Sequence, residues 1–331
     1  MTTITFQNVF VSSRACAVGP LEAQGPLKGK FDFCFDDLYC NEKSFEKAEQ
    51  KLLYSSIDLA IRKSELSIED IGLLCGGDLL NQLLSSHYVA RDFHKPFIGM
   101  YAACATSSAV IGQAALWVEN GYVEHALAFT SSHVATAERQ FRYPNEYGIQ
   151  KKETTTSTVT GAGAVVLSKR PSKIQVSAFT PGMIVDWQHT DANDMGLAMA
   201  PAVFSTLITH LKDTNRTIQD YDCIVSGDLS AVGFSFLLDL LVKDGYKIDD
   251  RLNDCGLLIY DTKKQNVFCG GSGCACSMVV SIAELLHLLE EGVYKRILVI
   301  ASGALLSPVA IHQKDTIPCI AHAIVYERRD L

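Results

Sequence analysis

Apolar and polar positions along the chain predict strands and helices in alternation. Residues 44–65 carry apolar side chains at helical spacing with charges on the other side, as in a helix that covers a core. Leu73-Leu74-Cys75 is short and apolar, and a Gly-Gly pair follows it, which predicts a buried strand that ends in a turn. We also expect helices at 79–92, 103–120, 199–212, 234–244 and 276–291, and strands at 97–101, 126–130, 223–226, 257–260 and 297–301. Such alternation predicts an α/β fold whose parallel strands are covered by helices on both faces.

Part of this pattern occurs twice. Gly77-Asp78-Leu79 returns as Gly227-Asp228-Leu229, a shift of 150 positions, and several residues between 97 and 131 return between 268 and 302, a shift of 171. Two units in the same order indicate a duplicated α/β module. Matching elements should face each other, and a site between them would take one helix start from each half. We place the N-terminal half at residues 1–170 and the C-terminal half at 171–331.

One segment, at about residues 134–160, has no counterpart in the other half. It carries Arg139 and Arg142 among aromatic side chains, followed by a threonine-rich stretch. We expect a long ordered loop here, and loops of that length are usually functional.

Composition excludes several classes of protein. A hydrophobic content of 48% supports a large core, and a net charge of −8 without a basic run argues against a nucleic-acid partner. The first residues lack the pattern of a signal peptide. The uncharged stretch 96–118 contains Pro96, Gly99 and polar residues, which favours a buried strand and helix over a transmembrane segment. Any association with a membrane should therefore be peripheral.

The 11 cysteines are odd in number and irregular in spacing, which indicates free thiols in a reducing compartment. Cys274-Ala275-Cys276 has no second ligand pair nearby, so we expect no metal site and no cofactor. Cys104 stands between a predicted buried strand and a small-residue helix. A thiol at a helix start is stabilised as thiolate by the helix dipole, so Cys104 is a candidate nucleophile or pocket thiol; the alternative is a structural cysteine.

At this point the chain resembles the thiolase superfamily, which includes the ketoacyl synthases. Cys104 is similar in context to the family's nucleophile, and Cys319, in the segment 319–327, is similar to its second, acid/base cysteine. The resemblance implies a thiolase-like fold of two duplicated βαβαβαββ halves in five α-β-α-β-α layers. It also implies a homodimer formed through the strand before the nucleophile helix, here residues 97–101.

Departures from that family bear on activity. Where its members carry a histidine or asparagine at the start of the second-half helix, this chain has Gly273-Cys274, and where synthases carry His-Gln-Ala-Asn it has Gly227-Asp228. A thiol nucleophile needs a base or cation nearby. We therefore interpret Cys104, Cys319 and Cys274 as vestigial and the protein as a binding protein, not an enzyme. An acyl-transfer enzyme that uses Cys104, and a structural docking component, are the alternatives.

A narrower resemblance covers nearly the whole chain. The strings at 77–82, 133–144, 253–256 and 270–277 resemble the stage V sporulation protein AD family. This implies binding of dipicolinic acid or its calcium chelate, and a part in its uptake into the developing spore (the forespore). It also implies membrane-embedded sporulation proteins as partners, and a peripheral place at the inner spore membrane.

Candidate ligand-binding residues follow from this resemblance and from the chemistry of a flat dianion. Arginine pairs well with carboxylate, which favours Arg139 and Arg142 beside the pocket thiol Cys104. Asp78 and Asp228 would matter if calcium entered with the ligand, but an aspartate in such a turn commonly bonds its own backbone. The remaining candidates are His133, Cys319 and His322.

Overall fold

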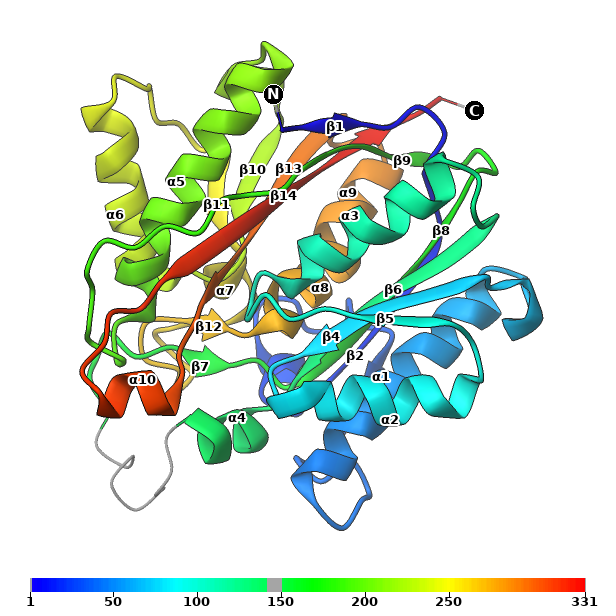
Figure 1. Ribbon diagram of the computed structural model, residues 1–331, viewed down its shortest axis with the longest axis horizontal. Helices are drawn as coiled ribbons and strands as arrows, with labels where there is room; N and C mark the ends of the chain where they lie inside the picture. The colour runs from blue at the N-terminus through cyan, green and yellow to red at the C-terminus, as the bar shows by residue number, and fades with distance from the viewer. Residues whose placement is uncertain (1, 142–150, 331) are drawn as a thin grey trace.

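The alternation of strands and helices is present in the computed structural model, which describes residues 2–141 and 151–330 (Figure 1). The N-terminal half runs β2 (Phe10–Val18), α1 (Phe45–Lys63), β4 (Leu73–Asp78), α2 (Leu84–Phe93), β5 (Phe97–Gly99), α3 (Thr106–Glu119), β6 (His125–Ser132) and β8 (Gly161–Ser168). The C-terminal half runs β9 (Ile174–Thr180), α5 (Met195–Thr214), β10 (Cys223–Ser226), α6 (Ser230–Lys243), β11 (Leu252–Asp254), α8 (Cys274–Val280), α9 (Leu286–Glu290), β13 (Arg296–Ala304) and β14 (Cys319–Arg328).

Both halves order their five main strands in the same way. The first half gives β5-β4-β6-β8-β2 and the second gives β11-β10-β13-β14-β9. In each set the first three strands pair in parallel and the next two pairings are antiparallel. The two sets meet where β2 lies against β9, with Phe10 opposite Gln175. The duplication that the sequence predicts is therefore confirmed in the topology.

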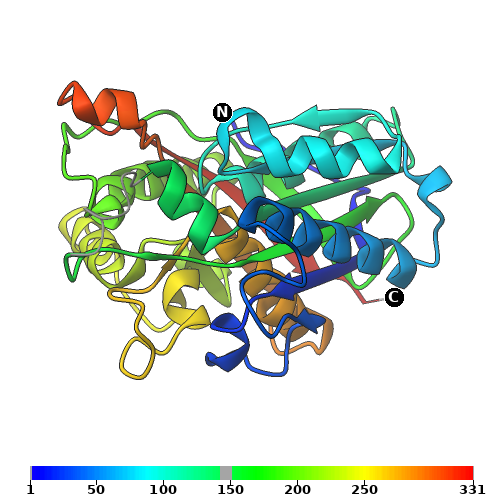
Figure 2. The same ribbon diagram turned by 90° about the horizontal axis from the view of Figure 1, so that it is seen from below.

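Helices complete five layers. α1 and α2 cover the outer face of the first sheet, and α5 packs on the outer face of the second with α6 against it (Figures 1 and 2). α3 lies between the sheets, because it packs on β4 and β6 of one and on β13 and β14 of the other. α8 shares this middle layer. The layered thiolase-like arrangement is confirmed.

Repeated local sequence makes repeated local structure. Ser67 and Asp70 form a capping box before β4, and Thr217 and Asp220 form the same box before β10. In each box the hydroxyl residue and the aspartate bond one another and each other's backbone, which satisfies amides at the start of a short turn.

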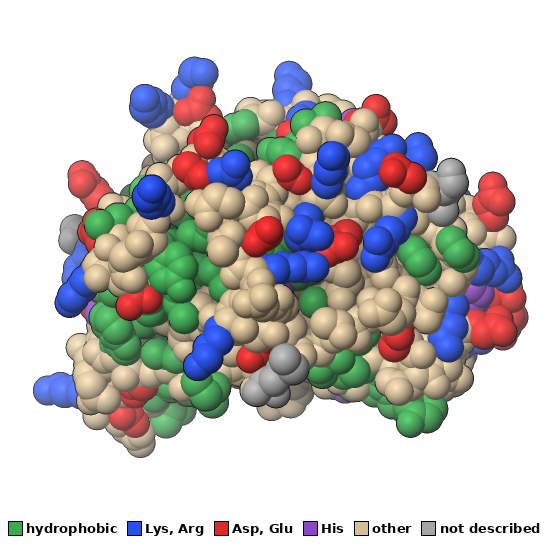
Figure 3. All heavy atoms as spheres, turned by 90° about the horizontal axis from the view of Figure 1, so that it is seen from above, with side chains coloured by type: hydrophobic (Ala, Val, Ile, Leu, Met, Phe, Trp, Pro, Cys, Tyr) green, Lys and Arg blue, Asp and Glu red, His purple; other side chains and the backbone are tan. Residues whose placement is uncertain are grey.

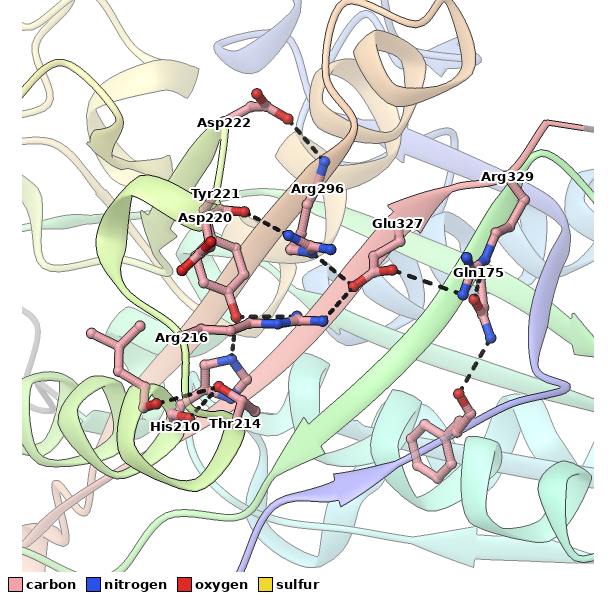
Figure 4. Close-up of polar contacts among 12 residues, drawn as sticks. Gln175, His210, Thr214, Arg216, Asp220, Tyr221, Asp222, Arg296, Glu327 and Arg329 are labelled. Carbon is pink, nitrogen blue, oxygen red and sulfur yellow. Dashed lines mark hydrogen bonds and ion pairs between the residues drawn. The ribbon is translucent and has the colours of Figure 1, made fainter.

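Ion pairs fix the far end of β14. Glu327 forms ion pairs with Arg296 at 2.8 Å and with Arg216 at 3.0 Å, which connect β14 to β13 and to the segment after α5 (Figure 4). On the face seen from above, acidic and basic side chains are interspersed (Figure 3). This mixing agrees with a chain that lacks a basic run.

Several predicted elements differ from those observed. The sequence predicts a strand at residues 257–260, but Cys255–Ile259 is a short helix, α7, because the Asp254 side chain caps it by accepting from the Leu257 amide. The segment 134–160 begins with α4 (Val134–Phe141) and includes β7 (Ser157–Thr158), which pairs with β12 (Gly271–Ser272). Other short elements are β1 (Ile4–Thr5), β3 (Phe33–Cys34), α10 (Pro308–His312) and a π-helical segment (Ser281–Leu285) that joins α8 to α9. Among the helices of the described residues, none is both long and apolar enough to cross a membrane.

Candidate functional site

Cys104 lies in a tight turn between β5 and α3. Ala103 has φ of +47°, a left-handed conformation that costs a non-glycine residue about 1–2 kcal/mol. α3 begins at Thr106, so the thiol precedes the helix by two residues instead of opening it as the sequence suggested. Gly303 of β13 makes room for the turn, since a Cβ there would lie 2.3 Å from the Ala102 carbonyl oxygen.

A cavity of about 480 Å³, counted to its open mouth, lies beside this turn. The first half supplies Cys104, Tyr101 and Phe141 to its wall, and the second half supplies Ser272, Gly273 and Met195. The starts of α3 and α8 thus meet at one cavity, as expected for a site between duplicated halves.

The cavity floor is a chain of hydrogen bonds that ends on Asp228. The Cys104 sulfur lies 3.7 Å from the Ser272 hydroxyl, and that hydroxyl donates to Asp228 Oδ2 at 2.7 Å. Ser302 donates to Asp228 Oδ1 at 2.7 Å, and the Gly273 amide donates to Oδ2 at 3.2 Å. Asp228 is only 1% exposed. The carboxylate is therefore held from three sides, directly behind the floor.

Burial and this carboxylate together decide the state of the thiol. Burial is the larger cause that raises the pKa of Cys104 well above its ordinary value, and the negative charge of Asp228 raises it further. Burial also raises the pKa of Asp228, although its hydrogen bonds oppose that rise. Since the thiolate is the reactive form, Cys104 at neutral pH is a protonated thiol and a weak nucleophile.

The other two candidate cysteines are engaged with backbone carbonyls. Cys274 is buried and donates to the Ser131 oxygen at 2.9 Å, and Cys319 is buried with its sulfur 3.4 Å from the Ile317 oxygen. Burial raises the pKa of Cys319 to about 12 and that of Cys274 well above its ordinary value. Both thiols are therefore protonated at neutral pH.

Neither candidate histidine hydrogen-bonds Cys104. His133 Nε2 bonds the Leu38 oxygen at 2.8 Å, and His322 Nδ1 accepts from the Gly182 amide at 3.0 Å. Burial lowers the pKa of both rings, for His322 to about 4. His322 and Cys319 line a neighbouring open cavity of about 860 Å³, counted together with the solvent space at its mouth; among the described residues, Tyr101 and Ala103 line both cavities. Ligand contact by His133, Cys319 and His322 stays a prediction.

Arg139 does not line the cavity. Arg139 is on α4 with a side chain that is 53% exposed, and it pairs with Glu46 at 2.6 Å. Arg142 lies outside the described residues. A cation that the sequence analysis missed is Lys151, which pairs at 2.8 Å with the cavity residue Glu138. No pattern in the sequence singled it out.

Asp228 has different partners from those expected from the sequence. The expectation that both repeated aspartates bond their own backbone holds for Asp78, which accepts from the amides of Leu80 and Ser86. It is wrong for Asp228, whose donors come from β12, the start of α8 and β13. The available signal was the Gly227-Asp228 pair in the segment where synthases carry His-Gln-Ala-Asn. Among the described residues, no group of three or more histidine, cysteine, aspartate or glutamate side chains could hold a metal ion.

Comparisons with known proteins agree with this fold. A family model described as stage V sporulation protein AD (SpoVAD) matches residues 1–327. The stage V sporulation protein AD of Bacillus subtilis (strain 168) is 52% identical over 320 residues, which is 97% of this chain and 94% of that protein.

Solved structures of OleA from Xanthomonas campestris share the fold at low identity. A variant of OleA in which alanine replaces a histidine has a TM-score of 0.63 at 15% identity, over 97% of this chain and 99% of that one. A second variant, in which serine replaces a cysteine and which holds bound lauric acid and lauroyl-CoA, has a TM-score of 0.61 at 15% identity, over 97% of this chain and 99% of that one.

Proposed function

Because the chain belongs to the stage V sporulation protein AD family, we propose that it is a non-enzymatic binding protein for dipicolinic acid (pyridine-2,6-dicarboxylate), free or as its calcium chelate. In this proposal it takes part in uptake of the ligand into the developing spore. The match over residues 1–327 supports a role in sporulation. The ligand is the one that the resemblance to this family implies, and the structure of the site supports the absence of catalysis.

The position of Asp228 carries the argument against catalysis. Ketoacyl synthases, which this chain resembles, place an imidazole in this part of the second half. Here a buried carboxylate, ordinarily a weaker base than imidazole, stands behind the thiol, and its negative charge raises the pKa of the thiol. The chain also has Gly273-Cys274 where the family carries a histidine or asparagine, and losing an oxyanion donor of that kind costs about two to three orders of magnitude in rate. A protonated thiol beside a fixed carboxylate favours binding over condensation.

The walls of the cavity suit a flat ring. Tyr101, Phe141, Leu79 and Met195 give apolar and aromatic surface, and Cys104 and Ser272 add small polar groups. Ligand sites are commonly apolar with a few placed polar groups of this kind.

Calorimetry tests this function directly. Dipicolinate titrated into the protein to millimolar concentration should give saturable heat, and benzene-1,3-dicarboxylate, which lacks the ring nitrogen, should bind more weakly. Ala137→Phe should abolish binding because Ala137 lines the cavity, whereas Ala135→Phe on the same helix, outside the cavity wall, should preserve it. Absence of heat from the wild-type protein would refute the proposal.

Acyl transfer is the competing function, and the placement of Cys104 on the cavity wall is what favours it. Incubation with several acyl-CoA thioesters, followed by mass spectrometry of the Cys104 peptide, separates the two. We expect no adduct, and a stable acyl group on Cys104 would favour the enzyme.

We also propose that the protein is a homodimer and works with membrane-embedded sporulation proteins. β5 is the edge strand of the first sheet, so its outer side can pair with a second copy. Light scattering at micromolar concentration tests the dimer, and a monomer would contradict it. In sporulating cells, the protein should fractionate with the inner spore membrane and be released by alkaline carbonate.

A further inference from the structure

Asp228 does not line the cavity; it lies behind two side chains that do. Ser272 and Cys104 separate its carboxylate from the cavity space. The Ser272 hydroxyl donates to Asp228, so its proton points away from the cavity, and the Cys104 sulfur lies 3.7 Å from the same hydroxyl oxygen. The unliganded floor therefore presents lone pairs to the cavity and keeps its protons on the inner side.

A carboxylate ligand needs the opposite arrangement. Carboxylates accept hydrogen bonds and cannot donate them, so they require floor donors that face the cavity. They are also repelled by an ionised carboxylate behind the floor, because charges interact strongly where water is excluded. An ionised Asp228 thus opposes a free dicarboxylate in two ways.

We propose that this site binds a free dicarboxylate with the uptake of one proton, which Asp228 holds. The inference rests on the proposed function and adds its proton dependence. A proton from solvent adds to an Asp228 oxygen, and no other covalent bond forms or breaks. The neutral acid then donates to the Ser272 oxygen, the Ser272 hydroxyl turns toward the ligand, and the Cys104 thiol is released to do the same. Asp228 acts as a positioning residue through these two groups.

One other group near Asp228 could take up the proton instead. The titratable groups that interact with it are Asp254 at the end of β11, Cys104 before α3, Cys255 on α7, Cys276 on α8 and Cys319 on β14. Each of these groups is neutral when protonated and negative when ionised, so none can offset the negative charge of a dianion. Asp254 is the other carboxyl group, but it bonds Ser226 and the amides of Leu229 and Ser230, none of which lines the cavity.

Proton uptake is measured by calorimetry in buffers of different ionisation enthalpy. Dipicolinate binding at one pH in phosphate and in Tris should give a slope of about one proton per ligand for the wild-type protein. Its affinity should fall about tenfold for each pH unit above the pKa of Asp228. Asp228→Asn cannot take up the proton, so its slope should be near zero and its affinity independent of pH.

The duplication supplies matched controls. Asp78→Asn, in the equivalent turn of the first half, should keep an uptake of about one proton, since Asp78 bonds the backbone near its own turn. Asp254→Asn should also keep it. Loss of uptake in Asp254→Asn together with its survival in Asp228→Asn would overturn the proposal.

The remaining outcomes are also decisive. The calcium chelate carries no net charge, so its binding should take up far less than one proton. If Asp228→Asn does not fold, infrared difference spectra of the wild-type protein should still show a protonated carboxyl band on ligand addition, and its absence would overturn the proposal. Saturable binding without proton uptake removes only this inference, whereas no binding at any pH removes the proposed function as well.

Discussion

The two copies of the Gly-Asp-Leu turn share a sequence but not a set of partners. Asp78 accepts from the backbone amides of Leu80 at 2.9 Å and Ser86 at 2.8 Å, both close along the chain. Asp228 accepts instead from Ser272 and Ser302, which are distant in sequence. Duplication placed two aspartates in equivalent turns, but only one of them supports the cavity floor.

The start of the following helix explains this difference. After β4 the chain makes an irregular turn before α2, which leaves amides for Asp78 to cap. After β10, α6 begins almost at once, and Asp254 takes the amides of Leu229 and Ser230 at 2.8 and 2.9 Å. With those amides already bonded, Asp228 turns to donors on other elements.

The neighbouring strand repeats the contrast. Ser131 at the end of β6 lies opposite Asp78, and Ser302 occupies the equivalent place on β13. Ser131 donates to Glu49 of α1 at 3.0 Å, whereas Ser302 donates to Asp228. In the first half the serine hydroxyl is therefore bonded to an acidic residue of α1, whereas the equivalent hydroxyl of the second half is bonded to the aspartate behind the cavity.

The largest effect, on the free energy of unfolding, should come from the Asp254 carboxyl group. This group accepts from the backbone amides next to Asp228, so that Asp228 bonds other donors. Burial raises the pKa of Asp254 to about 7. Because that pKa lies above the unfolded value of about 3.9, its stabilisation is complete below about pH 4 and is lost as the pH rises toward 7, by about 1.4 kcal/mol per pH unit. Urea titrations from pH 4 to 8 should show a flatter dependence for Asp254→Asn. The exposed Asp250→Asn serves as the control, and a wild-type slope in Asp254→Asn would contradict us.

Removal of each aspartate in turn should separate the two copies by stability. Asp78→Ala leaves two buried amides without a partner, which should cost about 3 kcal/mol. Asp228→Ala should cost less, about 1.5 kcal/mol, because it leaves one backbone amide, that of Gly273, without a partner, whereas its serine donors can rotate and Ser272 can turn to the cavity. Urea denaturation at pH 7 measures both free energies of unfolding. Equal costs would mean that the two turns are held in the same way.

Charge removal at Asp228 should make Cys104 more reactive. Asp228→Asn removes one cause that raises the pKa of the thiol, although burial remains, so alkylation of Cys104 at pH 8 should speed up by about tenfold. Iodoacetamide labelling followed by mass spectrometry gives the rate. Asp78→Asn should leave it unchanged, and acceleration in that variant would show that the contrast between the copies does not govern the thiol.

The smallest effect is expected on α4. Arg139→Ala removes an exposed pair with Glu46, which should change the free energy of unfolding by less than about 0.5 kcal/mol. Dipicolinate affinity should not change, since the side chain does not line the cavity. A tenfold loss of affinity would indicate that Arg139 contacts the ligand. Glu46→Ala is the control, because it removes the ion pair but keeps the arginine.

Local pattern was sufficient for most of the architecture. The repeat from Asp78 to Asp228 predicted the duplicated topology, and the capping residues Ser67 and Thr217 recur as the same local structure. Cys104 could be placed between a strand and a helix start because those features are encoded by neighbouring residues. The expectation that this strand is buried was wrong, since β5 is an edge strand whose residues are partly or fully exposed. The prediction of a strand at 257–260 was wrong because Asp254 caps a helix there. A short apolar run fits a strand or a buried helix equally well, so the cap was overlooked.

By itself, then, the sequence determined two α/β halves, their order of elements and a thiol where they meet. Tertiary structure decided that Asp228 rather than Asp78 faces that thiol, and that Arg139 turns to Glu46. Periodicity and capping depend on residues a few positions apart, whereas the partner of a buried carboxylate depends on which strands the fold brings side by side.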